Sequence, residues 1–151
     1  MTENYRFNQE LGLQLHKVVY LMDRTADRAV RAGADVTLSQ YLVILSLDKA
    51  SGFSISQQAI ADYLGIHKAA VSRHITLLER KGLVVRGDHL TSKREYNLQL
   101  TKAGRDTMIK ARASMFRTMT PHFQAAGPEL LERLRIFYAS LERDATRSAD
   151  E

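Results

Sequence analysis

The fold of this chain is decided by the stretch Gln58-Ala59-Ile60-Ala61-Asp62-Tyr63-Leu64-Gly65-Ile66-His67-Lys68-Ala69-Ala70-Val71-Ser72-Arg73. Ala61 is small, as a position where two helices cross closely requires, and Gly65 accommodates the positive φ of a tight turn. The side chains predicted to fill the crevice beneath the turn are Ile60, Leu64, Ile66 and Val71. The spacing from Ala61 through Gly65 to Val71 therefore predicts a helix-turn-helix.

Both helices of this motif have local start or stop signals. Ser56 is a suitable N-cap for the first helix, which we expect to end at Gly65. The second is predicted from about Lys68 to Lys81, with Gly82 as its stop. At about 100° per residue, Val71, Ile75 and Leu78 fall on its buried face, whereas the residues predicted to point outward are Ala69, Arg73, Thr76 and Arg80. The outward face is short, polar and basic.

Helical patterns also flank the motif on its N-terminal side. Apolar residues at helical spacing from Leu11 predict a helix of about five or six turns that ends before Gly33. Thr37 and Gln40 have the spacing of a capping box, in which each side chain satisfies a free backbone N–H, so a second helix is predicted to begin here and to end before Gly52.

On the C-terminal side the pattern changes to a hairpin and then back to helix. Residues 83–85 form a β-branched run, and residues 95–100 alternate polar and apolar side chains, so two antiparallel strands are predicted. Thr101 is expected to cap a further helix. Pro121 and Gly127-Pro128 are predicted to punctuate the chain before a last helix. The predicted fold is mainly α with a small β-hairpin wing.

The basic residues of the chain are concentrated on this motif. The chain has 22 Lys plus Arg and 17 Asp plus Glu, a net charge of +5. Residues 61–105 hold nine of the basic and four of the acidic residues, so this segment accounts for the whole excess. A short basic helix face suits the major groove of DNA, where Arg reaches guanine acceptors and a methyl group touches thymine. The basic hairpin tip, Lys93-Arg94, suits an adjacent minor groove. The alternatives are an ordinary solvated helix face and a solvated loop tip.

Several classes of protein are excluded by what the sequence lacks. It has no Cys, which removes disulfides and thiolate sites and favours a cytoplasmic location. It has neither a signal-peptide pattern nor an apolar run long enough to span a membrane. The five His residues are scattered, and His67 and His74 are seven apart rather than the three or four that chelate a metal from one helix. Without a phosphate loop or a nucleophile motif, we expect no enzyme activity, cofactor or metal.

The sequence resembles the MarR family of multiple-antibiotic-resistance regulators, which are dimeric winged-helix repressors and activators. The shared pattern spans roughly residues 37–104 and comprises Leu38-Ser39-x-x-x-x-Ile44-Leu45, Ile60-Ala61-x-x-Leu64-Gly65, Ala70-Val71-Ser72-Arg73, Leu78-Glu79-x-Lys81-Gly82-Leu83-Val84 and Leu100-Thr101-x-x-Gly104. The resemblance implies a single MarR-type chain over residues 1–151. Within it we expect a winged helix-turn-helix lobe over residues 36–101 and dimerisation helices over residues 8–32 and 102–147.

The resemblance also implies roles for particular residues. Ser72 and Arg73 fall where the family reads bases, and Ser56 and Gln57 fall where it tends to hold phosphate. Together with the outward face of the helix, these positions give the predicted DNA-binding residues. On the recognition helix they are His67, Lys68, Ala69, Ser72, Arg73 and Thr76, and on the wing they are Lys93 and Arg94. The family's wing reads Asp-x-Arg where this chain has Ser92-Lys93-Arg94, so we expect looser or differently aimed wing contacts.

A homodimer is predicted from the two ends of the chain. The last helix carries an apolar stripe too wide for a lone terminal helix, and the resemblance pairs it with the first helix of a partner. The residues predicted to form this interface are Leu11, Leu15, Leu130, Leu134, Phe137 and Leu141. Two recognition helices one turn of DNA apart would read a pseudo-palindrome. The alternative is a stripe folded back on its own chain.

An effector pocket is also implied by the resemblance, because related proteins often bind small phenolic or carboxylate molecules. His16, Tyr20 and Tyr41 are the residues predicted to line it, although such side chains also simply satisfy hydrogen bonds at a helix interface. The sequence thus predicts a sequence-specific regulator of transcription, a repressor that binds double-stranded DNA as a homodimer. The alternative is a winged-helix module that binds a protein partner without sequence-specific DNA binding.

Overall fold

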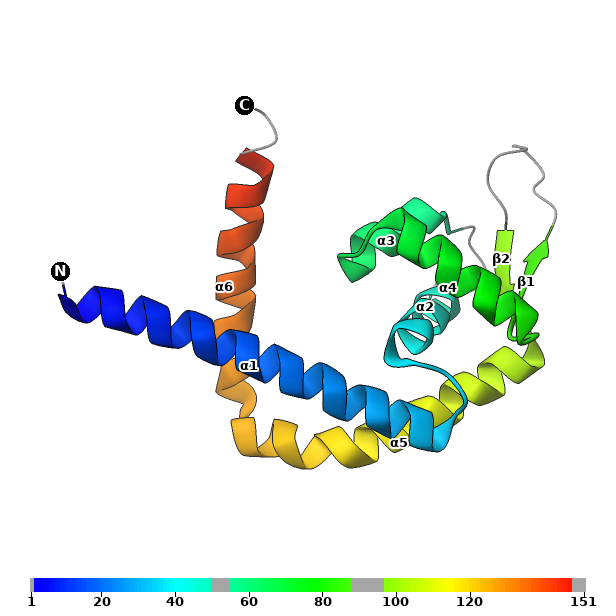
Figure 1. Cartoon of the computed structure of the whole chain (residues 1–151), viewed down its shortest axis with the longest axis horizontal. Helices are drawn as coiled ribbons and strands as arrows, with labels where there is room; N and C mark the ends of the chain where they lie inside the picture. The colour runs from blue at the N-terminus through cyan, green and yellow to red at the C-terminus, as the bar shows by residue number, and fades with distance from the viewer. Residues whose placement is uncertain (1, 50–54, 88–96, 148–151) are drawn as a thin grey trace. The chain divides into compact units, whose positions relative to one another are not determined.

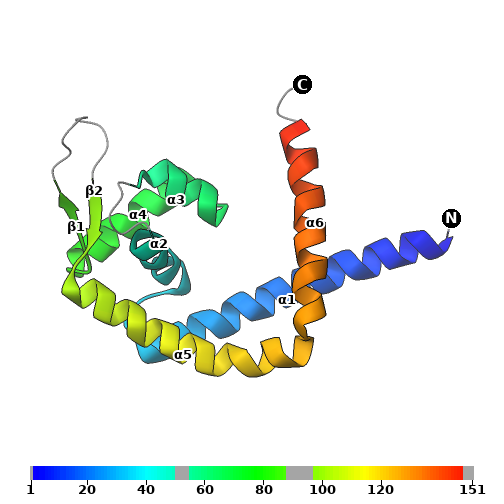
Figure 2. The same cartoon turned by 180° about the vertical axis from the view of Figure 1, so that it is seen from behind.

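The structure is a computed structural model that describes residues 2–49, 55–87 and 97–147 (Figures 1 and 2). Its elements follow in the order α1 (Thr2–Gly33), α2 (Leu38–Lys49), α3 (Gln57–Leu64), α4 (Lys68–Arg80), β1 (Val84–Gly87), β2 (Asn97–Leu100), α5 (Lys102–Ala126) and α6 (Pro128–Arg147). Two compact units divide the chain, Met1–Thr118 and Met119–Glu151, and the boundary between them falls inside α5. The first unit contains the predicted helix-turn-helix and hairpin, and the predicted fold class is confirmed.

The start of α2 is the predicted capping box. The Thr37 backbone N–H donates to the Gln40 side-chain oxygen at 3.0 Å, and the Gln40 backbone N–H donates to the Thr37 hydroxyl oxygen at 3.1 Å. Two N–H groups that a helix start leaves free are thereby satisfied. The preceding helix begins earlier than predicted, at Thr2, and ends at Gly33.

The helix-turn-helix forms as the sequence predicts. The Ser56 hydroxyl oxygen caps α3 by accepting from the Ala59 N–H at 3.0 Å, and Gly65 ends α3 with a φ of 64°. Ile60, Ala61 and Val71 are buried at the crossing of α3 and α4. The prediction is wrong for Ile66, which is 37% exposed. Its N–H bonds back to the Ala61 carbonyl at 3.0 Å, which places Ile66 within the turn rather than beneath it.

The hairpin follows directly from the end of α4. Gly82 has a φ of 68°, and its N–H donates to the Glu79 carbonyl at 2.9 Å, which stops the helix as predicted. β1 and β2 pair antiparallel with Val84 opposite Leu100 and Arg86 opposite Leu98. Because Val84, Leu98 and Leu100 are buried, one face of this two-stranded sheet closes the core of the lobe. Residues 88–96, which include the predicted hairpin tip, lie outside the described residues.

The start of α5 is fastened to the hairpin base. The Thr101 hydroxyl accepts from the Gly104 N–H at 2.9 Å, so Thr101 caps α5 as predicted, and it also donates to the Gly82 carbonyl at 2.8 Å. A Cβ at Gly104 would collide with the Leu83 carbonyl oxygen, which explains why this crossing needs glycine. The predicted break at Pro121 is wrong, since α5 continues through it to Ala126. Proline lacks one N–H, and a long helix accommodates that loss with a bend or a missing bond.

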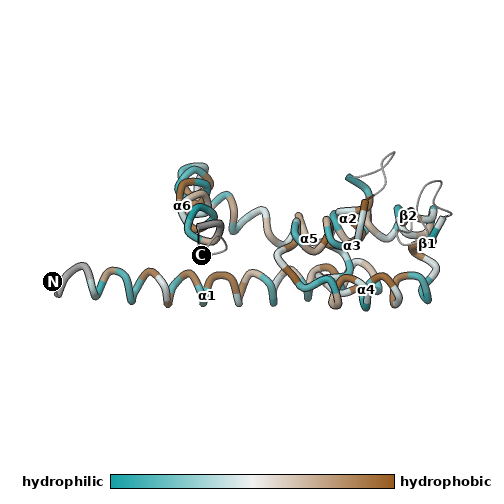
Figure 3. The backbone as a smooth tube through the Cα atoms, turned by 90° about the horizontal axis from the view of Figure 1, so that it is seen from above, coloured by the Kyte–Doolittle hydropathy of each residue, from teal (hydrophilic) through white to brown (hydrophobic). Residues whose placement is uncertain are grey.

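The two ends of the chain carry apolar side chains that the structure leaves exposed. The core of the first unit joins the last turns of α1 to α2, α3, α4, the hairpin and α5, and its largest fully buried side chains are Tyr41, Ile44, Ile60, Ile75, Leu78, Val30, Val43, Val71 and Val84. Residues 5–24 of α1 are exposed except for the half-buried Leu15. In the second unit, residues 128–145 of α6 are exposed throughout. Apolar segments recur along α1 and along α6 (Figure 3).

Candidate DNA interface

The first turns of α4 form the exposed part of the predicted recognition helix. Val71, Ile75 and Leu78 are fully buried, and this fixes which side of α4 turns outward. His67 is the N-cap residue, but its side chain makes no capping hydrogen bond. The predicted DNA-binding residues that are exposed are His67, Lys68, Ala69 and Arg73. Lys68 and Arg73 supply two positive charges and Ala69 supplies a methyl group on the outward side of α4. The first turn of α4 carries no acidic residue.

Ser72 and Thr76 are half-buried, so they differ from the other members of the predicted set. The Thr76 hydroxyl donates to the Ser72 carbonyl of the same helix at 3.0 Å. Its proton is therefore already used, and Thr76 offers a base only an acceptor oxygen and a methyl group.

The two predicted phosphate contacts lie at the start of α3. Ser56 uses its hydroxyl oxygen as an acceptor for the helix cap, which leaves its hydroxyl proton available to donate to a phosphate. Gln57 is the first residue of α3 and is half-buried. The N-terminus of a helix favours negative charge, so the position suits a phosphate.

The base of the wing is tied to the recognition helix by an ion pair that the sequence did not reveal. The Arg86 Nε of β1 donates to the Glu79 carboxylate of α4 at 2.7 Å, and both side chains are largely covered. The residues that we predict at the wing tip, Lys93 and Arg94, and the unusual Ser92 all lie outside the described residues. The role of the tip therefore stays a prediction.

His74 has an unusual environment within the recognition helix. Its Nδ1 is buried and has no hydrogen-bond partner among the described residues. Burial lowers the pKa of His74 below its ordinary value of 6.5, and the neighbouring Arg73 charge lowers it further. Both effects favour the neutral form of this imidazole, which lies on the side of α4 that flanks the buried face.

Two further contacts, also not foreseen from the sequence, join α1 to α2 and join the end of α4 to the connection between α1 and α2. The Asp27 carboxylate accepts from the Leu38 backbone N–H at 2.8 Å and from Arg31 Nε at 2.6 Å. These bonds hold the pKa of Asp27 below its usual value, the Leu38 amide contributing most. Lys81, at the end of α4, donates to the Asp35 carboxylate at 2.8 Å and also to the Asp35 backbone carbonyl. The Lys81 ammonium likewise lowers the pKa of Asp35.

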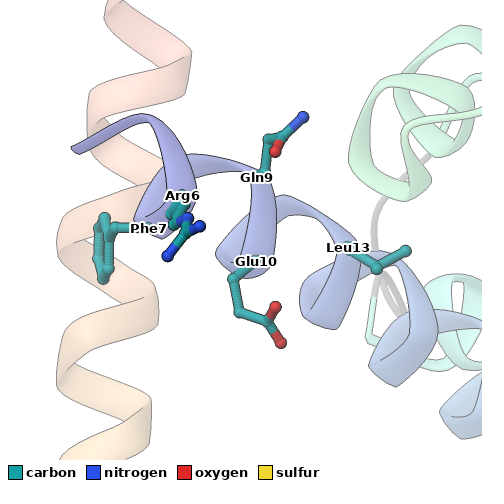
Figure 4. A pocket seen from close by; sticks show the side chains of 5 residues that line it. All are labelled: Arg6, Phe7, Gln9, Glu10 and Leu13. Carbon is teal, nitrogen blue, oxygen red and sulfur yellow. The ribbon is translucent and has the colours of Figure 1, made fainter. Parts of the chain in front are cut away.

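The predicted effector residues occupy different environments. Tyr41 is buried in the core, and this burial raises the pKa of its hydroxyl. His16 and Tyr20 lie on the exposed part of α1, where the Tyr20 hydroxyl accepts from Arg24 at 3.4 Å. A surface hollow near the start of α1 is lined by Arg6, Phe7, Gln9, Glu10 and Leu13. Figure 4 shows that these five side chains all project from a single helix, so they do not enclose a ligand, and none belongs to the predicted pocket.

The predicted dimerisation residues are available for contact. Leu11 in α1 and the four stripe residues of α6 are at least 40% exposed, and Leu15 is half-buried. None of the described helices has the length and apolar character needed to cross a membrane. No group of three or more His, Cys, Asp or Glu residues in the described ranges is placed to hold a metal ion.

The paired helices α3 and α4, followed by the hairpin β1–β2, define a winged helix-turn-helix protein. Residues 34–95, which span the lobe from the end of α1 into the hairpin, match the MarR family. This similarity to the family covers 62 of the 151 residues.

The chain is similar to one curated protein and to many solved structures. A putative transcriptional regulatory protein for the hcr operon of Thauera aromatica is 26% identical over 108 residues, which cover 72% of this chain and 64% of that protein. The match thus spans less than two thirds of the relative's length. CouR of Rhodococcus jostii RHA1, solved with p-coumaroyl-CoA bound, has a TM-score of 0.76 at 19% identity and covers 89% of this chain and 92% of its own. The MepR–DNA complex of S. aureus has a TM-score of 0.76 at 20% identity, and the match covers 88% of this chain and 96% of the MepR chain.

Proposed function

We propose that the chain is a transcriptional regulator that binds double-stranded DNA in a sequence-specific way through α4. The observation that carries this proposal is the exposed first half of α4, where Lys68, Ala69 and Arg73 stand outward while Val71 and Ile75 anchor the opposite side in the core. A guanidinium reads guanine, and a methyl group reads thymine. The same fold in the MepR–DNA complex supports the proposal.

The proposal includes a homodimer formed by the ends of the chain. Residues 5–24 of α1 make up more than five helical turns, yet the first unit covers almost none of their surface. Most helices in proteins are stabilised by packing of an apolar face, and an exposed apolar surface promotes association. A two-fold dimer would present two copies of α4 to a pseudo-palindromic operator.

We further propose that the protein is a repressor released by a small phenolic or carboxylate effector. CouR, which has the same fold, was solved with p-coumaroyl-CoA, and this supports a ligand of the phenolic class. The test is the melting temperature of the purified protein with p-coumaroyl-CoA, with free phenolic acids and with coenzyme A alone. A rise with a phenolic compound, coupled to weaker operator binding, is the expected result. No shift with any of them would contradict the effector assignment.

The DNA-binding proposal is tested by titrating the protein with duplexes at two salt concentrations. Selection from random duplexes first supplies the operator, and a scrambled duplex of equal composition serves as the control. We expect operator affinity to fall steeply between about 50 and 200 mM salt, by roughly 10³-fold if six phosphates are contacted. Equal affinity for the operator and the scrambled duplex at both concentrations would instead favour a protein-binding module.

A further inference from the structure

The last turns of α1 carry an additional cap for α2. Asp27 lies eleven residues before Leu38, and its carboxylate accepts from the Leu38 N–H, the first of α2, at 2.8 Å. The Thr37 and Gln40 capping box already satisfies two neighbouring N–H groups at this helix start. Asp27 therefore satisfies a third one from a different helix. This charge-assisted hydrogen bond is directional, and it fixes how α2 leaves α1.

The end of the recognition helix is fastened to the same place. Lys81 follows α4 directly, and its ammonium donates both to the carboxylate and to the backbone carbonyl of Asp35, in the short connection between α1 and α2. The Asp35 carboxylate is fully exposed, so its attraction for Lys81 is screened by water. The bond to the carbonyl restrains Lys81 even when that attraction is weak.

These contacts form what we name the polar joint, consisting of Asp27, Arg31, Asp35, Leu38 and Lys81. Its neighbours Val30 and Val36 are buried, so the joint borders the apolar core. Apolar packing resists separation of two elements but is weakly directional. The Asp27 bond restricts rotation of α2 about α1, and the Lys81 bonds restrict movement of α4 about the connection that leaves α1.

We propose that Asp27 and Lys81 are positioning residues, which fix the direction in which α4 projects from α1 and so set the half-site spacing that the dimer reads. This inference rests on the proposed dimeric DNA-binding function. In a dimer held through α1, any rotation of a lobe displaces its recognition helix relative to its twin. One base pair changes the separation of two half-sites by about 3.4 Å and also rotates one around the DNA axis. A rigid joint would therefore weaken binding to DNA whose half-site spacing differs from that of the operator, whereas a flexible joint would allow the lobes to adjust to it.

The experiment compares three variants on duplexes that differ only in spacing. Asp27→Ala removes the acceptor, Asp27→Asn keeps an oxygen for the Leu38 N–H, and Lys81→Met removes both bonds to Asp35. Asp23→Ala in α1 and Lys110→Met in α5 are matched controls, because both side chains are exposed and each loses the same charge. The probes are the selected operator, the operator with one base pair inserted or removed between the half-sites, and a single half-site.

We expect the wild-type protein and both controls to bind the altered spacings about tenfold or more weakly than the operator. Asp27→Ala and Lys81→Met should reduce this ratio to about threefold or less, while their affinity for the single half-site stays unchanged. Asp27→Asn should preserve most of the discrimination between half-site spacings, because it keeps an acceptor oxygen for the Leu38 N–H. If Asp27 acted only through its charge, Asp27→Asn would lose that discrimination as Asp27→Ala does.

Equal spacing discrimination in the wild-type protein, Asp27→Ala and Lys81→Met would overturn the inference. A wild-type protein that selects no duplex would instead overturn the proposed function, so the two failures are distinguishable. Circular dichroism establishes that each variant is folded. If Asp27→Ala does not fold, Lys81→Met carries the test, because it leaves the contacts between α1 and α2 in place.

Discussion

Arg73 is the exposed side chain of α4 best suited to reading a base, because its guanidinium offers a fork of donors to the two acceptors of guanine. We predict that Arg73→Ala weakens binding to the selected operator by about 1–3 kcal/mol and relaxes the preference at one position of each half-site. Fluorescence anisotropy with single-base variants of the operator measures both effects.

Arg133→Ala in α6 is the matched control for the Arg73 variant, because it removes the same exposed charge outside the winged lobe. Uniform weakening of all duplexes by Arg73→Ala, with the base preference intact, would show that Arg73 contacts phosphate rather than a base.

His74 differs from Arg73 in that its contribution depends on pH. Its folded pKa lies below 6.5, so as the pH falls the unfolded chain takes up the proton first. The stability associated with neutral His74 is therefore complete above pH 6.5 and is lost as the pH falls toward the folded pKa. We predict that His74→Leu, which removes the unpartnered Nδ1, raises the free energy of unfolding by about 1 kcal/mol at pH 7.5.

The gain from His74→Leu should be larger at pH 5.5, because only the wild-type protein then loses stability through this residue. Urea denaturation at the two pH values measures the difference. His122→Leu, at an exposed position of α5, is the matched control substitution. A His74→Leu variant with the wild-type pH dependence would contradict the prediction.

At the scale of the helix and the strand, the predictable features are those whose signals are close in sequence. The Thr37 and Gln40 box and the Ser56 cap join residues three apart, and both formed as predicted. Periodicity also assigned the buried face of α4 correctly, because Val71 and Ile75 share one side of any helix.

The features that the sequence did not disclose are contacts between elements. Glu79 and Arg86 are seven residues apart, but their pairing depends on how the chain turns at Gly82 from α4 into β1. Lys81 and Asp35 are 46 residues apart, and only the packed lobe brings them together. The tip of the wing stays a prediction, and so does the effector pocket.

Ser56 combines two roles at the start of α3, and substitution can separate them. We predict that Ser56→Ala lowers the free energy of unfolding by about 1 kcal/mol, because the Ala59 N–H loses its acceptor. Ser56→Asp restores an acceptor and so keeps the stability, but it places a negative charge where a phosphate is expected.

Operator binding should therefore fall more for Ser56→Asp than for Ser56→Ala, although Ser56→Asp is the more stable variant. Thermal unfolding and anisotropy titrations on the same two proteins provide the comparison. If Ser56→Asp binds the operator as tightly as the wild-type protein, Ser56 acts only as a helix cap.

On the scale of the whole molecule, the exposed ends of the chain are the surfaces that we propose to form the dimer. Eighteen consecutive residues of α6 are exposed, among them the whole predicted stripe, and α1 exposes Val18, Val19, Tyr20, Leu21 and Met22 in succession. A helix face that is apolar and uncovered favours association with another apolar face. The winged lobe has a core of its own, so the ends of the chain can be changed without removing the packing that holds α4 in place.

This separation allows a direct test of the dimer. We predict that Leu134→Asp in α6 converts the proposed dimer to monomer. Burying one Leu side chain stabilises an interface by roughly 1.5–3 kcal/mol, and each protomer would lose that contribution. Each protomer would also have to bury a charged carboxylate, which costs further free energy. The dimer dissociation constant should rise by about 10²-fold or more. Sedimentation equilibrium measures that constant, and circular dichroism verifies that the helices remain.

Ile136→Asp is the matched control, because Ile136 is also exposed on α6 but lies well away from the stripe of Leu130, Leu134 and Leu141 around the helix. It should leave the dimer intact. The monomeric Leu134→Asp protein should retain its affinity for a single half-site and lose the added affinity that two linked half-sites provide. A Leu134→Asp protein that is folded and still dimeric would place the interface on another surface, and equal dissociation by both variants would show that this stripe has no special role.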